Sequence, residues 1–264
     1  MRRITSWIAL FILITASSFA SPCTTTLLSG TYGYLRIGQT STGPLTALGA
    51  ITFDGSGSST GHQMIDRNGT FSENPPGKSN YTVNPDCSGT VLSPSAPPIP
   101  IVVIHNGSEA LGMSPNAGNN VAAHFERMFD DPRSGEDGVC SNATLNGVYG
   151  LLRSGSAHGQ LTTVGTAVFD GQGNITLNES VSMAGVMSDA PDQLLTYNIK
   201  ADCTGSQANA SGEAAQLVVV HDGGQILGLS MVPGTNVALH YERVVDRSSF
   251  SARTACRDLG QKIP

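Results

Sequence analysis

The chain contains the same pattern of residues twice. Residues 101–128 and 217–244 align at a constant offset of 116, and 14 of these 28 positions are identical. A repeat of this length exceeds the roughly 20–50 residues of solenoid and propeller units, and it is long enough to enclose a hydrophobic core of its own. The sequence therefore predicts two copies of one small domain in tandem.

Each copy consists of short strand-forming runs that end in turn signals. The dipeptides Asp54-Gly55, Asn68-Gly69 and Asp170-Gly171 are typical of β-hairpins, because hairpin turns need a positive φ. Strand signals recur about every 8–12 residues with no amphipathic helix of normal length, which indicates an all-β sandwich or an up-and-down barrel. We favour two tandem small antiparallel β-barrels of about eight strands each, because closure removes exposed sheet edges.

The N-terminus has the features of a secretory signal peptide. Arg2 and Arg3 precede an apolar run, and Ser18-Phe19-Ala20 fits a small-x-small cleavage site. We expect cleavage after Ala20 and a secreted or periplasmic protein, because the apolar run is too short to span a membrane and no later segment is long enough. The expected organisation is a signal peptide (1–20), a first barrel (21–129), a linker (130–139), a second barrel (140–245) and a C-terminal tail (246–264).

The five cysteines follow the repeat, and in an exported protein they indicate disulfides. Two pairings respect the repeat. One joins Cys23 to Cys87 and Cys140 to Cys203, which closes each copy within itself and leaves Cys256 free. The other joins Cys87 to Cys140 and Cys203 to Cys256. We favour the first pairing because each copy is then stapled independently, by about 3–4 kcal/mol in the chain-entropy model.

Charge and motifs exclude several classes of function. Without Arg2 and Arg3 the chain has 12 basic and 20 acidic side chains, a net charge of −8, and it has no cluster of Lys or Arg. We therefore expect no nucleic-acid partner and no binding to anionic membranes. No P-loop, dinucleotide fingerprint or metal-ligand spacing is present, so we expect no cofactor and no metal. No motif specifies a catalytic residue or an oligomeric state.

Three turn and cysteine motifs occur in both copies. They are Gly30 to Gly33, Phe53 to Gly57 and Tyr81 to Thr90 in the first copy, and Gly147 to Gly150, Phe169 to Gly173 and Tyr197 to Gly205 in the second. These motifs resemble the allene-oxide-cyclase-barrel-like domains of exported bacterial proteins. The resemblance covers most of both copies, and it implies a calycin-like barrel more than it implies an activity. A Gly-x-aromatic motif on the first strand and an Arg on the last are also similar to the lipocalin-type signature, in which the Arg covers the ring at one barrel end.

This resemblance assigns the closing roles to Tyr32 with Arg127, and to Tyr149 with Arg243. Lipocalins themselves prefer Trp at the aromatic position, and this chain has Tyr.

A second arginine in each copy suggests a ligand site. Arg36 alternates in register with Tyr32 and Tyr34, and Arg153 alternates with Tyr149. If this strand face points inward, the guanidinium lies at a barrel mouth and pairs with a ligand carboxylate. If the face points outward, the arginine is an ordinary surface charge. The candidate ligand-binding residues are Tyr32, Tyr34, Arg36, Arg127, Tyr149, Arg153 and Arg243.

Histidines and glutamates also recur in both copies. His124 and Glu126 share one face of the last strand, opposite its apolar face, and we expect them to face solvent or the other copy. An acid–base pair is the alternative reading. His105 precedes a turn, where we expect backbone groups to satisfy it. A zinc site on His105 and His124 lacks further ligands.

The sequence thus predicts a non-catalytic exported protein that binds a small apolar or amphipathic molecule in a barrel lumen. A structural or surface-interaction module with filled barrels is the first alternative. An isomerase or cyclase that acts in a barrel pocket is the second.

Overall fold

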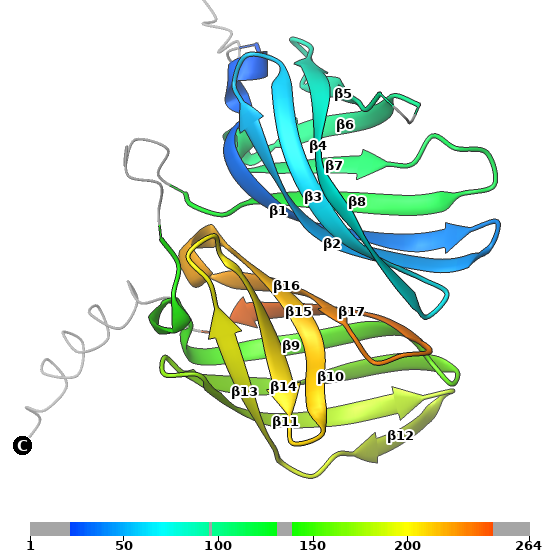
Figure 1. Ribbon diagram of the computed structural model, residues 1–264, viewed down its shortest axis with the longest axis vertical. Helices are drawn as coiled ribbons and strands as arrows, with labels where there is room; N and C mark the ends of the chain where they lie inside the picture. The colour runs from blue at the N-terminus through cyan, green and yellow to red at the C-terminus, as the bar shows by residue number, and fades with distance from the viewer. Residues whose placement is uncertain (1–21, 95–96, 131–138, 245–264) are drawn as a thin grey trace, which may run out of the picture.

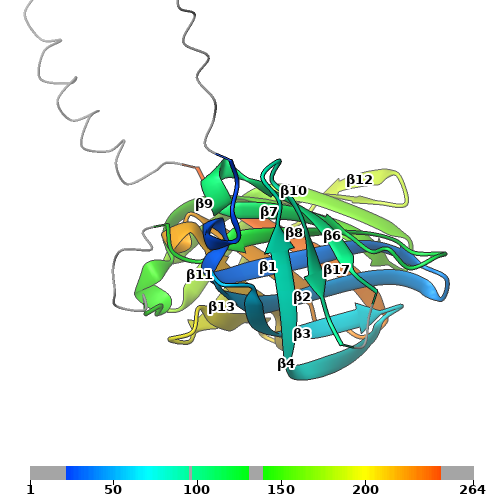
Figure 2. The same cartoon turned by 90° about the horizontal axis from the view of Figure 1, so that it is seen from above.

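The computed structural model describes residues 22–94, 97–130 and 139–244. The predicted signal peptide, most of the predicted linker, the predicted C-terminal tail and Cys256 lie outside the described residues. Two β-barrels stack one above the other in Figure 1 and overlap in the view from above in Figure 2. Apart from strands, the described residues form four single-turn 3-10 segments: Thr25–Leu27, His105–Gly107, Asn142–Thr144 and His221–Gly223.

The first barrel is closed and entirely antiparallel, as the sequence predicted. Each strand pairs with the next along the chain, and β1 pairs with β8 to complete the circle. Its strands are β1 (Ser29–Thr40), β2 (Gly43–Asp54), β3 (Ser58–Arg67), β4 (Thr70–Val83), β5 (Ser88–Leu92), β6 (Ile99–Ile104), β7 (Glu109–Met113) and β8 (Asn120–Arg127).

The second barrel repeats this topology with one additional strand. Pairing of β10 with β11 and of β17 with β9 closes eight strands, and the short β12 pairs only with β11. Its strands are β9 (Asn146–Ala157), β10 (Gln160–Asp170), β11 (Asn174–Met183), β12 (Val186–Asp189), β13 (Gln193–Ile199), β14 (Thr204–Asn209), β15 (Gly212–Val220), β16 (Gln225–Ser230) and β17 (Thr235–Arg243).

The hairpin and disulfide predictions are confirmed. At the first Asp-Gly signal, Gly55 has positive φ and Asp54 does not, so this hairpin turn is not type I′; instead the Asp54 carboxylate accepts hydrogen bonds from the backbone N–H groups of Ser56 and Ser58. Asn68 and Gly69 both adopt positive φ, as a type I′ hairpin requires. The disulfides are Cys23–Cys87 and Cys140–Cys203, so each barrel is stapled within itself.

Aromatic side chains fill one half of each lumen. In the first barrel, the ring of Phe53 packs edge-on against both Tyr32 and Tyr81, with centroids 5.3 and 4.8 Å away. In the second, Phe169 makes the same edge-on contacts with Tyr149 and Tyr197. These rings are buried, so one end of each barrel is a packed core, and any ligand is restricted to the opposite end.

Candidate functional site

An arginine lies at the open end of the first lumen. Inward-facing side chains of β1 alternate from Tyr32 through Tyr34 to Arg36, so the strand carries the guanidinium past the packed aromatic half. Arg36 Nη1 donates to Gln63 Oε1 at 3.3 Å, and the Tyr34 hydroxyl donates to the same oxygen at 3.2 Å. The inward placement on which the ligand hypothesis depends is therefore present in the fold.

A cavity of about 250 Å³ opens beside this arginine. Arg67, at the end of β3, is the second charged residue on its wall, and Leu45 and Val121 supply an apolar floor. The remaining lining groups are neutral and polar, so no carboxylate lines the cavity. The lining residues are Arg36, Thr40, Ser41, Thr42, Leu45, Arg67, Asn116, Asn119 and Val121.

The electrostatics of this cavity favour an anion. Burial lowers the pKa of Arg36 from its usual range, the nearby Tyr34 opposes that shift, and the positive charge of Arg67 adds to it. Two guanidinium groups therefore repel each other beside a cavity that holds no countercharge of its own. An anionic group placed between them would relieve that repulsion in a partly desolvated site.

The second barrel neutralises its equivalent arginine internally. Arg153 Nη2 lies 2.5 Å from Glu179 Oε1, and its Nε donates to Thr163 at 2.9 Å. The Glu179 side chain is only 2% exposed and the Arg153 side chain 26%, so this is a partly buried ion pair. At the offset of 116, the position of Glu179 corresponds to Gln63. The two barrels thus differ at the one residue that decides whether the mouth arginine has a carboxylate partner.

The other arginine–tyrosine pairs close the packed ends of the barrels. Arg127 donates to the Tyr32 hydroxyl at 2.8 Å through Nη2, and it also donates to the carbonyls of Leu27 and Gly107. Arg243 lies over the Tyr149 ring, with its guanidinium carbon 4.8 Å from the centroid. In both barrels, the guanidinium group donates hydrogen bonds to backbone carbonyls and contacts the tyrosine.

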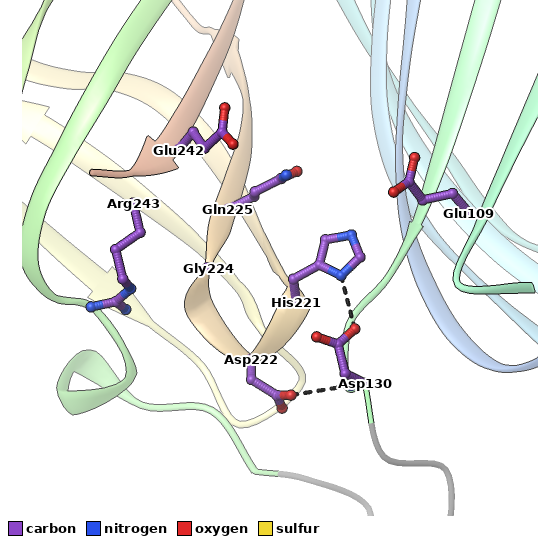
Figure 3. A pocket seen from close by; sticks show the side chains of 8 residues that line it. All are labelled: Glu109, Asp130, His221, Asp222, Gly224, Gln225, Glu242 and Arg243. Atoms are coloured by element: carbon purple, nitrogen blue, oxygen red, sulfur yellow. Dashed lines mark hydrogen bonds and ion pairs between the residues drawn. The ribbon is translucent and has the colours of Figure 1, made fainter. Parts of the chain in front are cut away.

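A second cavity, of about 610 Å³, lies where the barrels meet (Figure 3). Glu109 faces it from the first barrel, and His221 faces it from the second. His221 Nδ1 lies 2.8 Å from Asp130 Oδ1, and the backbone N–H of Asp130 donates to Asp222. The cavity is lined by Glu109, Asp130, His221, Asp222, Gly224, Gln225, Glu242 and Arg243.

Histidines and carboxylates alternate along the edge of this junction. His105 and His124 both bond Glu109, at 2.8 and 2.9 Å. His124 also lies 3.0 Å from the buried Glu126, whose second oxygen faces His221 at 3.8 Å. Hydrogen bonding to Glu126, and then to Glu109, raises the pKa of His124 although burial opposes it.

The structure shows which surroundings His124 and Glu126 face on the last strand of the first barrel. Glu126 faces the second barrel and is buried there, while His124 is partly exposed. The expectation that backbone groups satisfy His105 was incomplete, because carboxylates bind the imidazoles of both His105 and His221.

Sequence reasoning missed Gln63, Arg67 and Glu179. A usable signal was present: comparison of the copies at the offset of 116 shows Gln where the other copy has Glu. The ion pair between Glu179 and Arg153 could not be predicted from the sequence. The two residues lie 26 positions apart, and their side chains meet only because β10 pairs with both β9 and β11.

Within residues 22–94, 97–130 and 139–244, no group of three or more His, Cys, Asp or Glu side chains is placed to hold a metal ion. Over the same residues, no helix is long and apolar enough to cross a membrane.

Comparisons with known proteins add little to this geometry. No family model and no curated protein matches the chain. Among solved structures, it is similar to a protein of unknown function from the DUF3598 family of Nostoc punctiforme, at 11% sequence identity and a TM-score of 0.23. The match covers 83% of this chain and 97% of the other.

Proposed function

We propose that the first barrel binds a small amphipathic molecule with an anionic head group at its mouth, without converting it chemically. The observation that carries the proposal is the pairing of Arg36 with the neutral Gln63, where the second barrel pairs Arg153 with Glu179. Only the first barrel thereby presents a mouth arginine without a carboxylate, beside a cavity that Arg67 also lines.

The proposed ligand follows from the lining groups. Guanidinium groups match carboxylates and phosphates in bidentate geometry, while Leu45 and Val121 offer contact to a short apolar portion. The cavity is smaller than the ~300–1,000 Å³ that enclose drug-sized molecules, so we expect a small ligand or a partly enclosed one. None of the lining residues is a His, Asp, Glu, Lys or Cys, which favours binding over an acid–base isomerisation.

Isothermal titration with octanoate and with the neutral octanol tests this function. We expect octanoate to bind with one site per chain and to weaken as salt is added, and octanol to bind at least tenfold more weakly. Gln63→Glu would place a carboxylate against Arg36, as Glu179 does against Arg153, and we expect it to abolish octanoate binding.

Gln172→Glu is the matched control, because it adds the same charge at an exposed turn of the second barrel. Equal affinity for octanoate and octanol would contradict the proposal. Unchanged octanoate binding by Gln63→Glu would contradict it equally.

We also propose that both repeats are calycin-type barrels of the allene-oxide-cyclase-like kind. Support comes from eight-strand up-and-down closure and from the arginine that lies over a first-strand tyrosine in each barrel. Export to the periplasm or the medium is proposed on the signal-peptide pattern, together with two disulfides, which persist mainly in oxidising compartments. Sequencing the N-terminus of the exported protein tests the export, and we expect Ser21 as the first residue.

A further inference from the structure

The two barrels contact each other through unlike faces. We call the outward surface of the first two strands of a repeat face A, and the outward surface of its last three strands face B. Face A of the first barrel, on β1 and β2, packs on face B of the second, on β15, β16 and β17 (Figure 1). The interface is therefore heterologous, since each barrel contributes a different surface.

The apolar contacts at this interface are close. A Cβ atom added to Gly33 would lie 2.6 Å from Val218 Cγ1 and 2.7 Å from Val220 Cγ1, so the glycine permits the approach. Around it, face A contributes the buried Leu35, Leu48 and Ala50. Face B contributes the buried Val218, Val220, Leu227, Leu229 and Ala238, and the residues of both faces form one core cluster.

One polar chain accompanies the apolar contact. The Thr46 hydroxyl donates to Asn236 Oδ1 at 2.7 Å, and Asn236 Nδ2 donates to the Asp66 carbonyl at 3.1 Å. Thr46 and Asn236 are both buried. The pairing therefore satisfies the polar groups that the interface encloses.

Face B of the first barrel has equivalent apolar residues on β6 and β7, and these lie open, although Glu126 at the end of β8 is buried against the second barrel. Val102, Leu111 and Met113 are equivalent to Val218, Leu227 and Leu229 at the offset of 116. Leu111 is 45% exposed and Met113 59% exposed, against 2% for Leu227 and 0% for Leu229.

Face A of the second barrel is open in the same way. Leu152 and Val164, the equivalents of Leu35 and Leu48, are 50% and 62% exposed, and Val148 and Val168 beside them are also exposed. Gly150 takes the place of Gly33, and an added Cβ would meet no atom closer than 3.9 Å. The outward side chains of β9 and β10 include no Lys, Arg or Glu, although solvent-facing surfaces are usually rich in charge.

The polar pair is retained as well. Thr162 on face A of the second barrel and Asn120 on face B of the first are equivalent to Thr46 and Asn236, and both are exposed. The main apolar residues of the internal interface and its Thr–Asn pair thus have exposed counterparts, except that Thr166 takes the place of Ala50, and the two sets of counterparts are complementary to each other.

We infer that face A of the second barrel binds face B of the first barrel in another copy of this chain. The contact would repeat the internal one, with Val102, Leu111 and Met113 of one copy against Leu152 and Val164 of the next. Because the two faces differ, each copy that joins uses one face and leaves its other face free, so the growing assembly still has one free face of each kind at its ends. Such heterologous contacts produce rings or linear filaments rather than a closed two-fold dimer.

Sedimentation velocity over a concentration series tests this assembly with face-specific variants of the full mature chain. The wild type should grow beyond a dimer as concentration rises. Val164→Glu blocks face A, Leu111→Glu blocks face B, and each alone should raise the apparent dissociation constant at least tenfold. An equimolar mixture of these two variants should form a dimer that does not grow, because each supplies the face that the other lacks.

Two further variants separate docking from folding. Gly150→Val should also abolish association, since its side chain points outward and meets no close atom of its own chain but blocks the close approach of a second copy. Leu194→Glu, at a residue of β13 that is 78% exposed and outside both faces, should associate like the wild type. A wild type that stays monomeric throughout, or a mixture of Val164→Glu and Leu111→Glu that forms no dimer, would overturn the inference.

Discussion

At the scale of single residues, the two barrels differ in charge at one equivalent position, which is Gln63 in the first and Glu179 in the second. Glu179 completes a partly buried ion pair with Arg153, so the positive charge of that arginine is balanced within the second barrel. Gln63 bonds Arg36 without cancelling its charge. A buried or half-buried guanidinium interacts more strongly with an anion than one in bulk water does, because the local dielectric is lower. One amide in place of one carboxylate therefore converts a structural element into a candidate binding group.

Asp66 is the residue for which burial makes the clearest prediction about pH. Its side chain is fully buried, and one carboxylate oxygen accepts a hydrogen bond from the Gly69 N–H at 2.9 Å. The other oxygen has no hydrogen-bond partner among the described residues. Burial raises the pKa of Asp66 to about 6, so the native state retains this proton at pH values where the unfolded chain has released it.

We predict that Asp66→Asn stabilises the protein above pH 6 and leaves it unchanged near pH 4. In the wild type, the contribution of Asp66 to the unfolding free energy is largest below pH 4. It falls by on the order of 2–3 kcal/mol as the pH rises to about 6, and Asn removes this loss. Urea unfolding at pH 4 and pH 7.5 measures the difference between variant and wild type.

Asp54→Asn is the control for this prediction. Hydrogen bonds from Ser56 and then Ser58 lower the pKa of Asp54 to about 2. The contribution of Asp54 is therefore present above about pH 4 and is lost as the pH falls through 2, so its substitution should destabilise at pH 7.5. A stabilising effect of Asp66→Asn that is equal at both pH values would show that charge burial is not the cause.

At the scale of elements, the strands and staples were largely predictable. Asp-Gly and Asn-Gly dipeptides mark hairpins because their backbone geometry is a local property of two residues. The cysteine register left two pairings, and the favoured one, internal to each barrel, is the one that the structure contains. The additional strand β12 was not predicted, since its pairing with β11 depends on a hairpin through Ala184 and Gly185 that no Asp-Gly or Asn-Gly signal marks.

Removal of either disulfide should lower the free energy of unfolding of the coupled two-barrel molecule. Cys140–Cys203 closes a sequence separation of 63 residues and Cys23–Cys87 one of 64. For loops of this length the chain-entropy model gives about 4 kcal/mol. We expect the double variant Cys140→Ala/Cys203→Ala to lose about that much in urea unfolding monitored by a tyrosine of the second barrel. The corresponding pair of substitutions at Cys23 and Cys87 is the matched control, and unchanged stability in both would contradict the prediction.

At the scale of the whole molecule, the two barrels share a hydrophobic cluster and are not independent domains joined only by a linker. Leu35 and Leu48 of the first barrel belong to the same cluster as Leu227 and Leu229 of the second. The backbone N–H of Asp222 donates to the Met128 carbonyl, and His221 bonds Asp130. Apolar burial of this kind couples the unfolding of two domains.

Gly33→Val should therefore uncouple the barrels while leaving each one folded. The new side chain would overlap Val218 and Val220, but valine suits a β-strand. We expect calorimetry to show one coupled transition in the wild type and two transitions in the variant. Gly150→Val, the same substitution at the equivalent position of the second barrel, should keep the single transition in the monomer. A single transition in Gly33→Val would mean that the interface does not couple the domains.

The sequence alone determined what depends on neighbours along the chain and on exact repetition. Hairpin turns, strand alternation and the placement of Arg36 on the same strand face as Tyr32 and Tyr34 follow from local backbone geometry and from the offset of 116, and the same offset leaves two possible cysteine pairings, of which the structure contains the one internal to each barrel. The tertiary structure decided what depends on contacts between distant strands. It paired Arg153 with Glu179, left Arg36 with Gln63, buried Asp66, and joined face A of one repeat to face B of the other. Nothing in either copy distinguishes a face that will be covered from one that will stay exposed, because the two copies carry the same apolar pattern and only their packing breaks the symmetry.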